Sequence, residues 1–300
     1  MSAVRIGIST SSSLTADRAA TVAAMMIERA ATAYESGLSS LSIGDHHAQR
    51  GWYMQNTPML GRLLAEWPDR PAGCLFLLPL WNPVLVAEHV GTLASMVDAP
   101  FIVQTGIGDG ATQFRAFGAD LRKRGADTDE SIRLVRGLLA GETVESERFG
   151  IGPVSIGLRP TGAVEWWIGG HAAATLRRAA RLGAAWYGGP GLRPAESEKL
   201  LAAYHEACDE AGSVPRSIVR RDVLVLADGD RARAEAERLV ARGYRGMSID
   251  QLVVGSPEDA ARDLRALGDL GYDDVIIRCM TPNQADALES IRLLGELNRT

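Results

Sequence analysis

The stretch WWIGGHAA, residues 166–173, decides the fold of this chain. An apolar run typical of a buried strand passes through two glycines and enters a helical segment with no linker between them. A strand that turns directly into a helix is one half of a βαβ unit, and chains of such units form parallel strands joined by helical crossovers. The fold therefore depends on how often this unit recurs.

The unit recurs along the whole chain. Short runs with strand character alternate with segments of helical periodicity. The predicted strands are Val4–Thr10, Ser39–Gly44, Gly73–Leu78, Phe101–Thr105, Glu165–Ile168, Ala185–Tyr187, Ser217–Ala227 and Asp274–Cys279. Eight units in 300 residues favour a closed (β/α)8 TIM barrel over an open sheet, because such barrels need roughly 250 residues. We predict one α/β domain over residues 1–300, with a glycine-rich insertion at Gly141–Val164.

Composition excludes several classes of function. The net charge is -5 and the pI is about 5.6, so nucleic acid is not an expected partner. The most apolar stretch, Cys74–Ala87, is interrupted by prolines and is shorter than the ~20 residues that span a bilayer, and the N-terminus lacks a secretory pattern. Three cysteines with no close pairs predict neither a disulfide framework nor a metal site. We expect a cytoplasmic protein without a membrane partner.

The second predicted strand ends in a histidine pair, Gly44-Asp45-His46-His47. Alternation along a strand places Asp45 on the helix-facing side and His46 on the side that lines the barrel. Because barrel enzymes keep their active sites at the C-terminal ends of the strands, His46 is predicted to point into the mouth and to exchange a proton. Asp45 would orient it, and His47 would point away. The alternative is a pair that only caps the next helix.

Two glycine-rich turns are candidate cofactor sites. Gly169 and Gly170 end a strand where a helix begins, and the free N–H groups of that first turn, with His171 beside them, would suit a phosphate. Gln104 and Gly106 share the lumen face of the fourth strand, where the amide could reach a ligand and glycine would make room for a flat ring. The loop also fits Gly-x-Gly-x-x-Ala, but no second strand of a dinucleotide-binding unit follows within ~30 residues.

Charged residues interrupt two predicted strands. Arg220 and Asp222 lie in the seventh strand and Arg278 lies in the eighth. An unpaired buried charge is costly, so we expect ion pairs there. Since Arg278 lies near the C-terminal end of its strand, it could contact an anionic group of a substrate.

Together these segments resemble the bacterial-luciferase-like family of flavin and deazaflavin oxidoreductases. The order and spacing of the motifs carry the resemblance, and no single motif does. The matching segments are Gly37–His47, Pro79 with Asn82-Pro83, Gly106–Gly110, Ala116–Gly118, Trp167–Gly170, Arg177–Gly183 and Val254–Glu258.

The resemblance implies a reduced cofactor, either FMN or coenzyme F-420, across the strand ends, with its phosphate at the Gly169-Gly170 helix start and His46 as the catalytic histidine. It also implies a non-proline cis peptide at Cys74–Leu75 or the next bond, behind the cofactor ring, so that Cys74 and Leu75 would be cofactor-binding residues. The sequence leaves the choice of cofactor open.

The expected function is that of an oxidoreductase or monooxygenase acting on a small organic molecule, as a homodimer. A separate flavin reductase would supply reduced FMN, or reduced F-420 would arrive as such. One alternative is a cofactor-binding subunit that does no chemistry within a luciferase-like heterodimer. An unrelated barrel enzyme is disfavoured, because the only lysines, Lys123 and Lys199, lie in helical stretches and not at strand ends.

Overall fold

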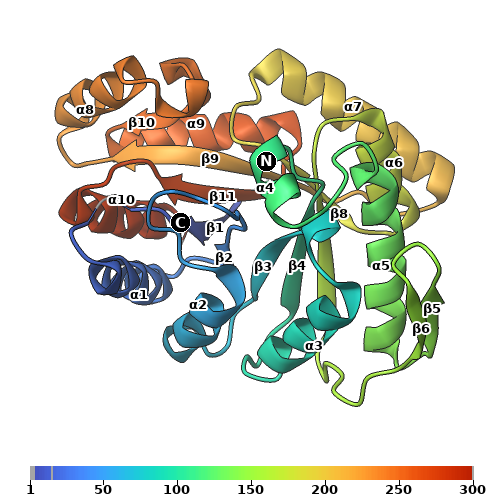
Figure 1. The fold of residues 1–300 in the computed structure, drawn as a ribbon. Helices are drawn as coiled ribbons and strands as arrows, with labels where there is room; N and C mark the ends of the chain where they lie inside the picture. Colours follow the sequence, from blue (N-terminus) through green and yellow to red (C-terminus); the bar gives the residue numbers. More distant parts are fainter. Residues whose placement is uncertain (1–3, 15, 299–300) are drawn as a thin grey trace.

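Eight parallel strands form the centre of the structure, a computed structural model that describes residues 4–14 and 16–298 (Figure 1). Each strand pairs with the next, and the last pairs with the first, so the sheet closes and the predicted α/β TIM barrel is confirmed. In order around the barrel the strands are β1 (Arg5–Thr10), β2 (Leu41–Ile43), β3 (Ala72–Leu77), β4 (Phe101–Gly106), β7 (Val164–Gly169), β8 (Ala185–Gly188), β9 (Ser217–Val225) and β11 (Asp274–Cys279).

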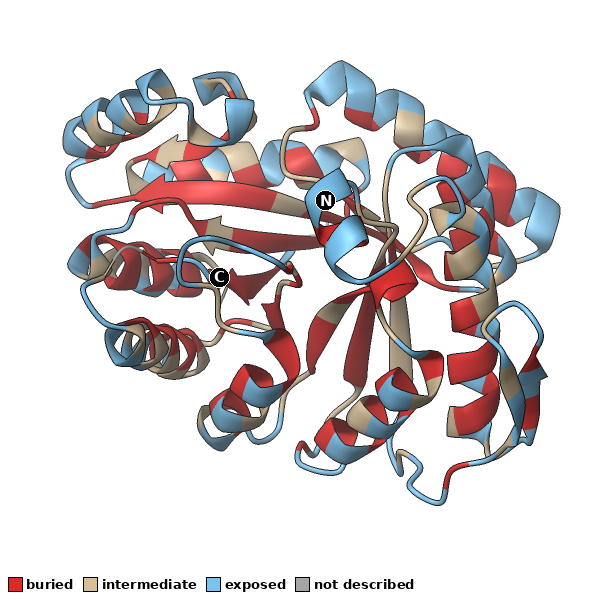
Figure 2. Cartoon of the chain, in the orientation of Figure 1, coloured by how far each residue is buried: buried red, intermediate tan, exposed pale blue. Residues whose placement is uncertain are grey.

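Helices surround the barrel and bury one face each against it (Figure 2). The α-helices are α1 (Ala19–Glu35), α2 (Asn56–Leu63), α3 (Pro83–Ala94), α4 (Ala111–Ala116), α5 (Arg124–Ala140), α6 (Ala173–Arg181), α7 (Pro194–Ala211), α8 (Gly229–Ala241), α9 (Pro257–Leu270) and α10 (Gln284–Leu297). The 3-10 turns are η1 (Leu64–Glu66), η2 (Leu78–Leu80), η3 (Tyr244–Gly246) and η4 (Ile249–Gln251). Within the described ranges, no helix combines the length and the apolar character that a bilayer crossing requires.

Three short strands were not predicted from the sequence. β5 (Val144–Ser146) and β6 (Ile151–Val154) form an antiparallel hairpin in a separate sheet, within the segment predicted as an insertion. β10 (Val253–Gly255) pairs in parallel with the C-terminal end of β9, on residues that lie beyond the β8 pairing. The hairpin therefore lies outside the barrel sheet, and β10 extends one edge of it.

The two faces of the strands have different partners. Val103 on β4 and Cys74 on β3 are fully buried in the core between strands and helices, whereas Ile102 and Trp167 belong to a cluster inside the barrel. Cys74 thus points away from the lumen, contrary to the expectation that it contacts the cofactor, because alternation along β3 gives its neighbour Leu75 the inner position.

The prediction of a cis peptide at Cys74–Leu75 or the next bond is wrong. Every peptide bond between the described residues is trans. β3 pairs residue by residue with β4 from Ala72 to Leu77, so this stretch is a regular parallel strand.

Candidate active site at the barrel mouth

His46 lies just beyond the C-terminal end of β2 and is half-buried. Its ring centre is 5.9 Å from that of Tyr53, whose hydroxyl lies close to Gly44. Burial lowers the pKa of His46, and the attraction of Asp109 and Asp45 opposes this only in part. His46 is therefore a neutral imidazole at neutral pH, able to accept a proton.

Asp45 contacts His47, Leu77 at the end of β3 and Trp81. It was expected to orient His46, and the structure, which describes both residues, does not show such a contact. Its Oδ2 accepts hydrogen bonds of 2.8 Å from the backbone N–H of Leu77 and from Trp81 Nε1. Its Oδ1 faces His47 Nε2 at 3.1 Å, without the alignment of a hydrogen bond. The sequence could not show this, because the partners of Asp45 lie more than thirty residues further along the chain.

His47 is buried in an aromatic pocket away from the lumen. Its ring centre is 4.5 Å from that of Phe117 and 5.7 Å from that of Trp81, and its backbone N–H donates to Gln113 Oε1. The two neighbouring histidines therefore occupy different environments, and of the two, His46 has access to the mouth.

Gln104 brings an unused hydrogen-bond donor into the barrel. Its side chain is 2% exposed, and its Nε2 has no hydrogen-bond partner among the described residues. In the paired strands it lies between Leu75 and Trp167. A buried amide without a partner costs free energy unless a ligand or water accepts its hydrogen bond.

Gly106 leaves less free space than expected. A Cβ atom there would lie 2.9 Å from Leu77 Cδ2 and 3.5 Å from Leu75 Cδ1. These two leucines, with Leu80 and Phe114, form a small apolar cluster at the end of β3 and β4. The room beside Gly106 is thus occupied by apolar side chains that could contact one face of a flat ring.

The turn from β7 into α6 keeps the geometry of an anion site. Gly170 has a φ of 135°, a conformation that other residues rarely adopt, and its carbonyl accepts a hydrogen bond from Trp186 Nε1. His171 Nε2 accepts a hydrogen bond from the N–H of Gly189, so this ring is neutral and serves the turn. The N-cap residue Ala172 is exposed and makes no side-chain cap, which leaves the first N–H groups of α6 open to an anion.

Sequence reasoning missed part of a charged cluster at the opposite side of the mouth. The carboxylate of Asp222, fully buried within β9, accepts a hydrogen bond of 2.8 Å from Tyr244 and lies within 3.1 to 3.6 Å of Arg220 and Arg245. Arg220 and Asp222 formed a sequence signal because they interrupt an apolar strand. Tyr244 and Arg245 did not, because they come from η3, a turn in which Arg245 has a left-handed φ of 49°.

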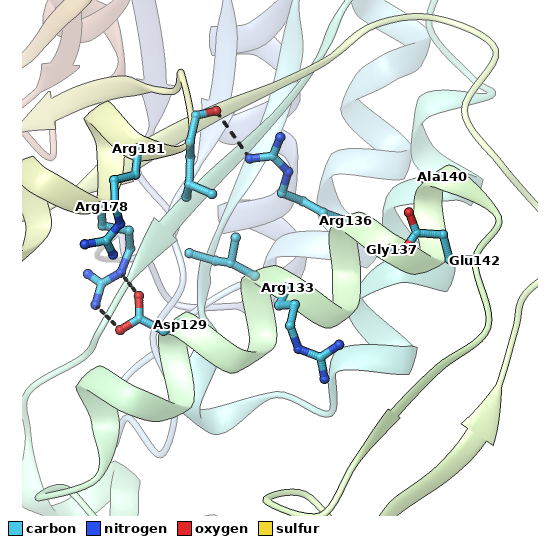
Figure 3. A pocket seen from close by; sticks show the side chains of 10 residues that line it. Asp129, Arg133, Arg136, Gly137, Ala140, Glu142, Arg178 and Arg181 are labelled. Carbon is cyan, nitrogen blue, oxygen red and sulfur yellow. Dashed lines mark hydrogen bonds and ion pairs between the residues drawn. The ribbon is translucent and has the colours of Figure 1, made fainter. Parts of the chain in front are cut away.

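A second arginine-rich hollow lies outside the barrel, between α5 and α6 (Figure 3). Its volume is about 590 Å³, and most of its arginines have acceptors of their own. Arg178 binds both carboxylate oxygens of Asp129, at 2.6 and 3.0 Å, and Arg136 donates to the carbonyl oxygen of Leu182. None of the site residues predicted from the sequence lines this groove.

A comparison with protein families gives one match over most of the chain. The family described as luciferase-like monooxygenase matches residues 4–269. An uncharacterised protein of Mycobacterium tuberculosis is 34% identical over 137 residues, which cover 45% of this chain and 47% of that protein, so the match spans about half of the relative's length. An F420-dependent glucose-6-phosphate dehydrogenase of Rhodococcus erythropolis is 26% identical over 304 residues, covering 88% of this chain and 90% of the relative.

Solved structures share the fold at low sequence identity. The monooxygenase RslO1 from Streptomyces bottropensis has a TM-score of 0.84 at 20% identity, covering 98% of each chain. The oxygenating constituent of 3,6-diketocamphane monooxygenase from Pseudomonas putida, solved with FMN, has a TM-score of 0.83 at 16% identity over 98% of this chain and 97% of the other. An F420-dependent secondary alcohol dehydrogenase has a TM-score of 0.80 at 15% identity over 99% and 98%.

Proposed function

This chain belongs to the luciferase-like monooxygenase family, and from that premise we propose that it is an oxidoreductase whose site is the C-terminal mouth of the barrel. The observation that carries the proposal is the convergence at this mouth of a neutral histidine, an unpartnered amide and an open helix start. These are His46, Gln104 and the first turn of α6. A neutral imidazole at the mouth suits proton transfer to or from a bound substrate.

The residues present fit a flavin or deazaflavin with a phosphate. The open N–H groups after Ala172 would hold the phosphate, because no arginine or lysine of the same turn is placed to do so. The amide of Gln104 would donate to a polar edge of the ring, and Leu75 would contact its face. Reduced FMN bound there would supply oxygen activation, and reduced coenzyme F-420 would supply a hydride.

The chain's own residues have separate tasks in this proposal. His46 would hold or accept the proton that the substrate gains or loses, since it is neutral and half-buried at the mouth. Asp45 would act indirectly, by fixing the loop after β2 to β3 and η2 through Leu77 and Trp81. The cluster of Leu75, Leu77, Leu80 and Phe114 would exclude water from one side of the site.

Support for the two cofactors comes from different relatives. One solved structure with this fold contains FMN, and other relatives are named as F420-dependent enzymes. We propose that one of these two reduced cofactors binds, that a separate flavin reductase is the partner if it is FMN, and that the enzyme acts as a cytoplasmic homodimer. Sedimentation velocity measurements test the homodimer.

Anaerobic titration with reduced FMN and with reduced F-420, followed by tryptophan fluorescence, tests the proposed function. The sharpest variant is Ala172→Asp, since Ala172 has an ordinary extended backbone and its side chain is exposed. A carboxylate there would compete with the phosphate for the same N–H groups, so we expect about tenfold or more weaker binding, in line with the loss of charge-assisted hydrogen bonds.

The matched control is Ala172→Asn, which also caps the helix but carries no charge. Both variants should be more stable than wild type by about 1 kcal/mol, because Asp and Asn are better N-caps than Ala. If the two variants bind the cofactor equally well, the phosphate does not bind at the start of α6. If neither reduced cofactor binds wild type at concentrations up to about 100 μM, a dissociation constant typical of a weak site, the proposed function is overturned.

A further inference from the structure

Positive charge exceeds negative charge on the β9–β11 side of the mouth. Arg220, Arg245 and Arg278 approach one another closely enough that Arg220 and Arg278 both lower the pKa of Arg245, in addition to its burial. Asp222 is the carboxylate that pairs with this group, and it pairs with two of the three arginines. A cluster of three guanidinium groups around one carboxylate is electrostatically unsatisfied without a further anion.

Hydrogen bonding within the cluster is also incomplete. Nε and Nη2 of Arg220 are buried and have no hydrogen-bond partner among the described residues. The guanidinium group of Arg278 donates to one acceptor, the hydroxyl oxygen of Ser11, at 3.0 and 3.3 Å. A neutral hydroxyl does not compensate the charge of Arg278, so a carboxylate or phosphate oxygen would be a stronger partner.

A cavity adjoins these arginines. Its volume is about 340 Å³, which falls within the range of about 300–1,000 Å³ typical of small-molecule sites. The cavity is lined by two of the arginines, by polar groups of the loop after β1, and by apolar groups of the loops after β1 and β11. Its lining residues include Ser11, Leu14, Tyr244, Arg245, Arg278 and Met280.

The cavity is separate from the start of α6. In the ring of strands, β7 lies four positions from β1, so the turn after β7 and the cavity beside β1 and β11 are on opposite sides of the mouth. His46 follows β2, the neighbour of β1, and Tyr53 beside it experiences the charge of Arg278. Arg245, which lines the cavity, also lowers the pKa of His46, so a molecule in the cavity would lie on the His46 side of the mouth and would leave the start of α6 free.

We propose that the substrate of this enzyme is a small organic anion, whose carboxylate or phosphate group binds Arg278 and Arg245 in this cavity. The inference rests on the proposed function, and it adds the chemical class of the substrate and the residues that select it. Asp222 is a positioning residue here: with Tyr244 it holds Arg245 over the mouth, and it leaves Arg278 without a carboxylate partner.

Benzoate and its neutral counterpart benzamide are suitable probes, since they differ in the charge of one group. Both are titrated by calorimetry, without cofactor, against the Ala172→Asp protein, in which the start of α6 is blocked. We expect benzoate to bind at least about tenfold more tightly than benzamide, and inorganic phosphate to compete with benzoate. Equal binding of benzoate and benzamide would overturn the anionic substrate.

Arg278→Met and Arg245→Met test the residues, with Arg181→Met as the matched control. Arg181 lies in the groove between α5 and α6, so its loss changes the net charge equally but leaves the mouth intact. Benzoate affinity should fall about tenfold or more in the two mouth variants and stay within about twofold in the control, while benzamide affinity stays unchanged. An equal fall in all three variants would show a general charge effect and would overturn the assignment.

Arg278→Lys keeps the proposal testable if a methionine variant does not fold. Lysine retains the charge but not the forked donor geometry, so an intermediate affinity for benzoate is expected. Titration of the wild-type protein with reduced FMN and with reduced F-420 separates the two proposals. If a cofactor binds and benzoate shows no preference, only the anionic substrate fails; if no cofactor binds, the proposed function fails.

Discussion

Two arginine-lined hollows of the described structure, the groove between α5 and α6 and the cavity at the barrel mouth, differ in how their arginines are neutralised. In the groove between α5 and α6, Arg178 forms a two-point ion pair with Asp129, and Arg133 does the same with Glu130 on the same helix. At the barrel mouth, Arg220 and Arg245 share Asp222, and the hydrogen-bond acceptor of Arg278 among the described residues is the hydroxyl of Ser11. The groove has the larger volume, yet its charges are largely satisfied within the protein.

The difference shows that the number of arginines is a poor guide to a binding site. Exposed ion pairs such as Arg133–Glu130 contribute little and need no ligand. Buried guanidinium groups that lack a carboxylate partner favour an anionic ligand, and of these two hollows the mouth contains such groups. We therefore expect the ligand at the unpaired charge, and the following experiments test this distinction from the largest expected effect to the smallest.

His46→Ala should have the largest effect, and it acts only at the mouth. We expect turnover to fall by about 10²–10⁴-fold, the usual contribution of a general acid or base. Affinity for the reduced cofactor should change little. Steady-state rates with the first substrate found in a screen of carboxylates and phosphate esters give the measurement. His205→Ala on α7 is the control, because His205 is exposed. Full turnover in His46→Ala would remove His46 from the mechanism.

Asp222→Asn and Asp129→Asn compare the two hollows by stability. Removal of the fully buried Asp222 leaves arginines without their carboxylate, which should lower the free energy of unfolding by about 3–5 kcal/mol. Asp129 has a half-exposed side chain, so its loss should cost about 1 kcal/mol. Urea unfolding monitored by circular dichroism measures both. Equal losses would show that the two hollows do not differ in this way.

Acid should affect the two regions in separate pH ranges. Burial lowers the pKa of His46 below 6.5, so the unfolded chain binds the proton first and stability is lost as the pH falls below about 6.5. Arg133 lowers the pKa of Glu130 from 4.5 to about 2, so that its stabilising contribution is complete above pH 4.5 and disappears as the pH falls towards 2.

Urea unfolding across this pH range, in His46→Gln and Glu130→Gln, checks the assignment. His46→Gln should reduce the loss of stability between pH 6.5 and 5, and Glu130→Gln should alter the curve only below pH 4.5. The turnover of wild type should decline on the acid side with an apparent pKa below 6.5, because the neutral ring is the reactive form. A decline centred above pH 6.5 would contradict the burial of His46.

Glu130→Gln at neutral pH should have the smallest effect. The pair lies on one exposed helix face at i, i+3 spacing, so its loss should cost about 0.2–0.5 kcal/mol and less at high salt. Thermal unfolding at about 20 mM and about 500 mM salt measures the difference, because the ion pair is weakly screened at the lower concentration and strongly screened at the higher one. Exposed ion pairs usually contribute no more than about 1 kcal/mol to the free energy of unfolding. A larger loss would mean that the groove charges are coupled as a network.

Sequence patterns predicted the elements that depend on local periodicity. The eight barrel strands and the position of His46 after β2 follow from alternation of apolar and polar residues, and the direction of Leu41 and Ile43 toward the helices agrees with it. β10 has only three residues and was missed because so short a segment carries no periodicity.

Contacts between distant segments could not be predicted in the same way. The alternation that placed His46 correctly at the end of β2 says nothing of Leu77 and Trp81, which bind Asp45. The role of Cys74 was assigned from a resemblance and not from the face of its strand, and the structure places it in the outer core. Arg245 reaches the mouth because of one left-handed residue conformation, for which the sequence offers no signal.

The pairing of β1 with β11 has a consequence for how the protein is made. Arg5 on β1 is paired with Asp274 on β11, so β1 cannot complete its pairing until a strand 269 residues further along the chain has been synthesised. A ribosome adds about 5–20 residues per second, which means that β1 has an unpaired edge for tens of seconds while the rest of the barrel emerges. An open parallel edge of this kind is prone to pair with other chains. Slow release or chaperone binding during synthesis should therefore affect the yield of this protein more than the stability of its finished barrel.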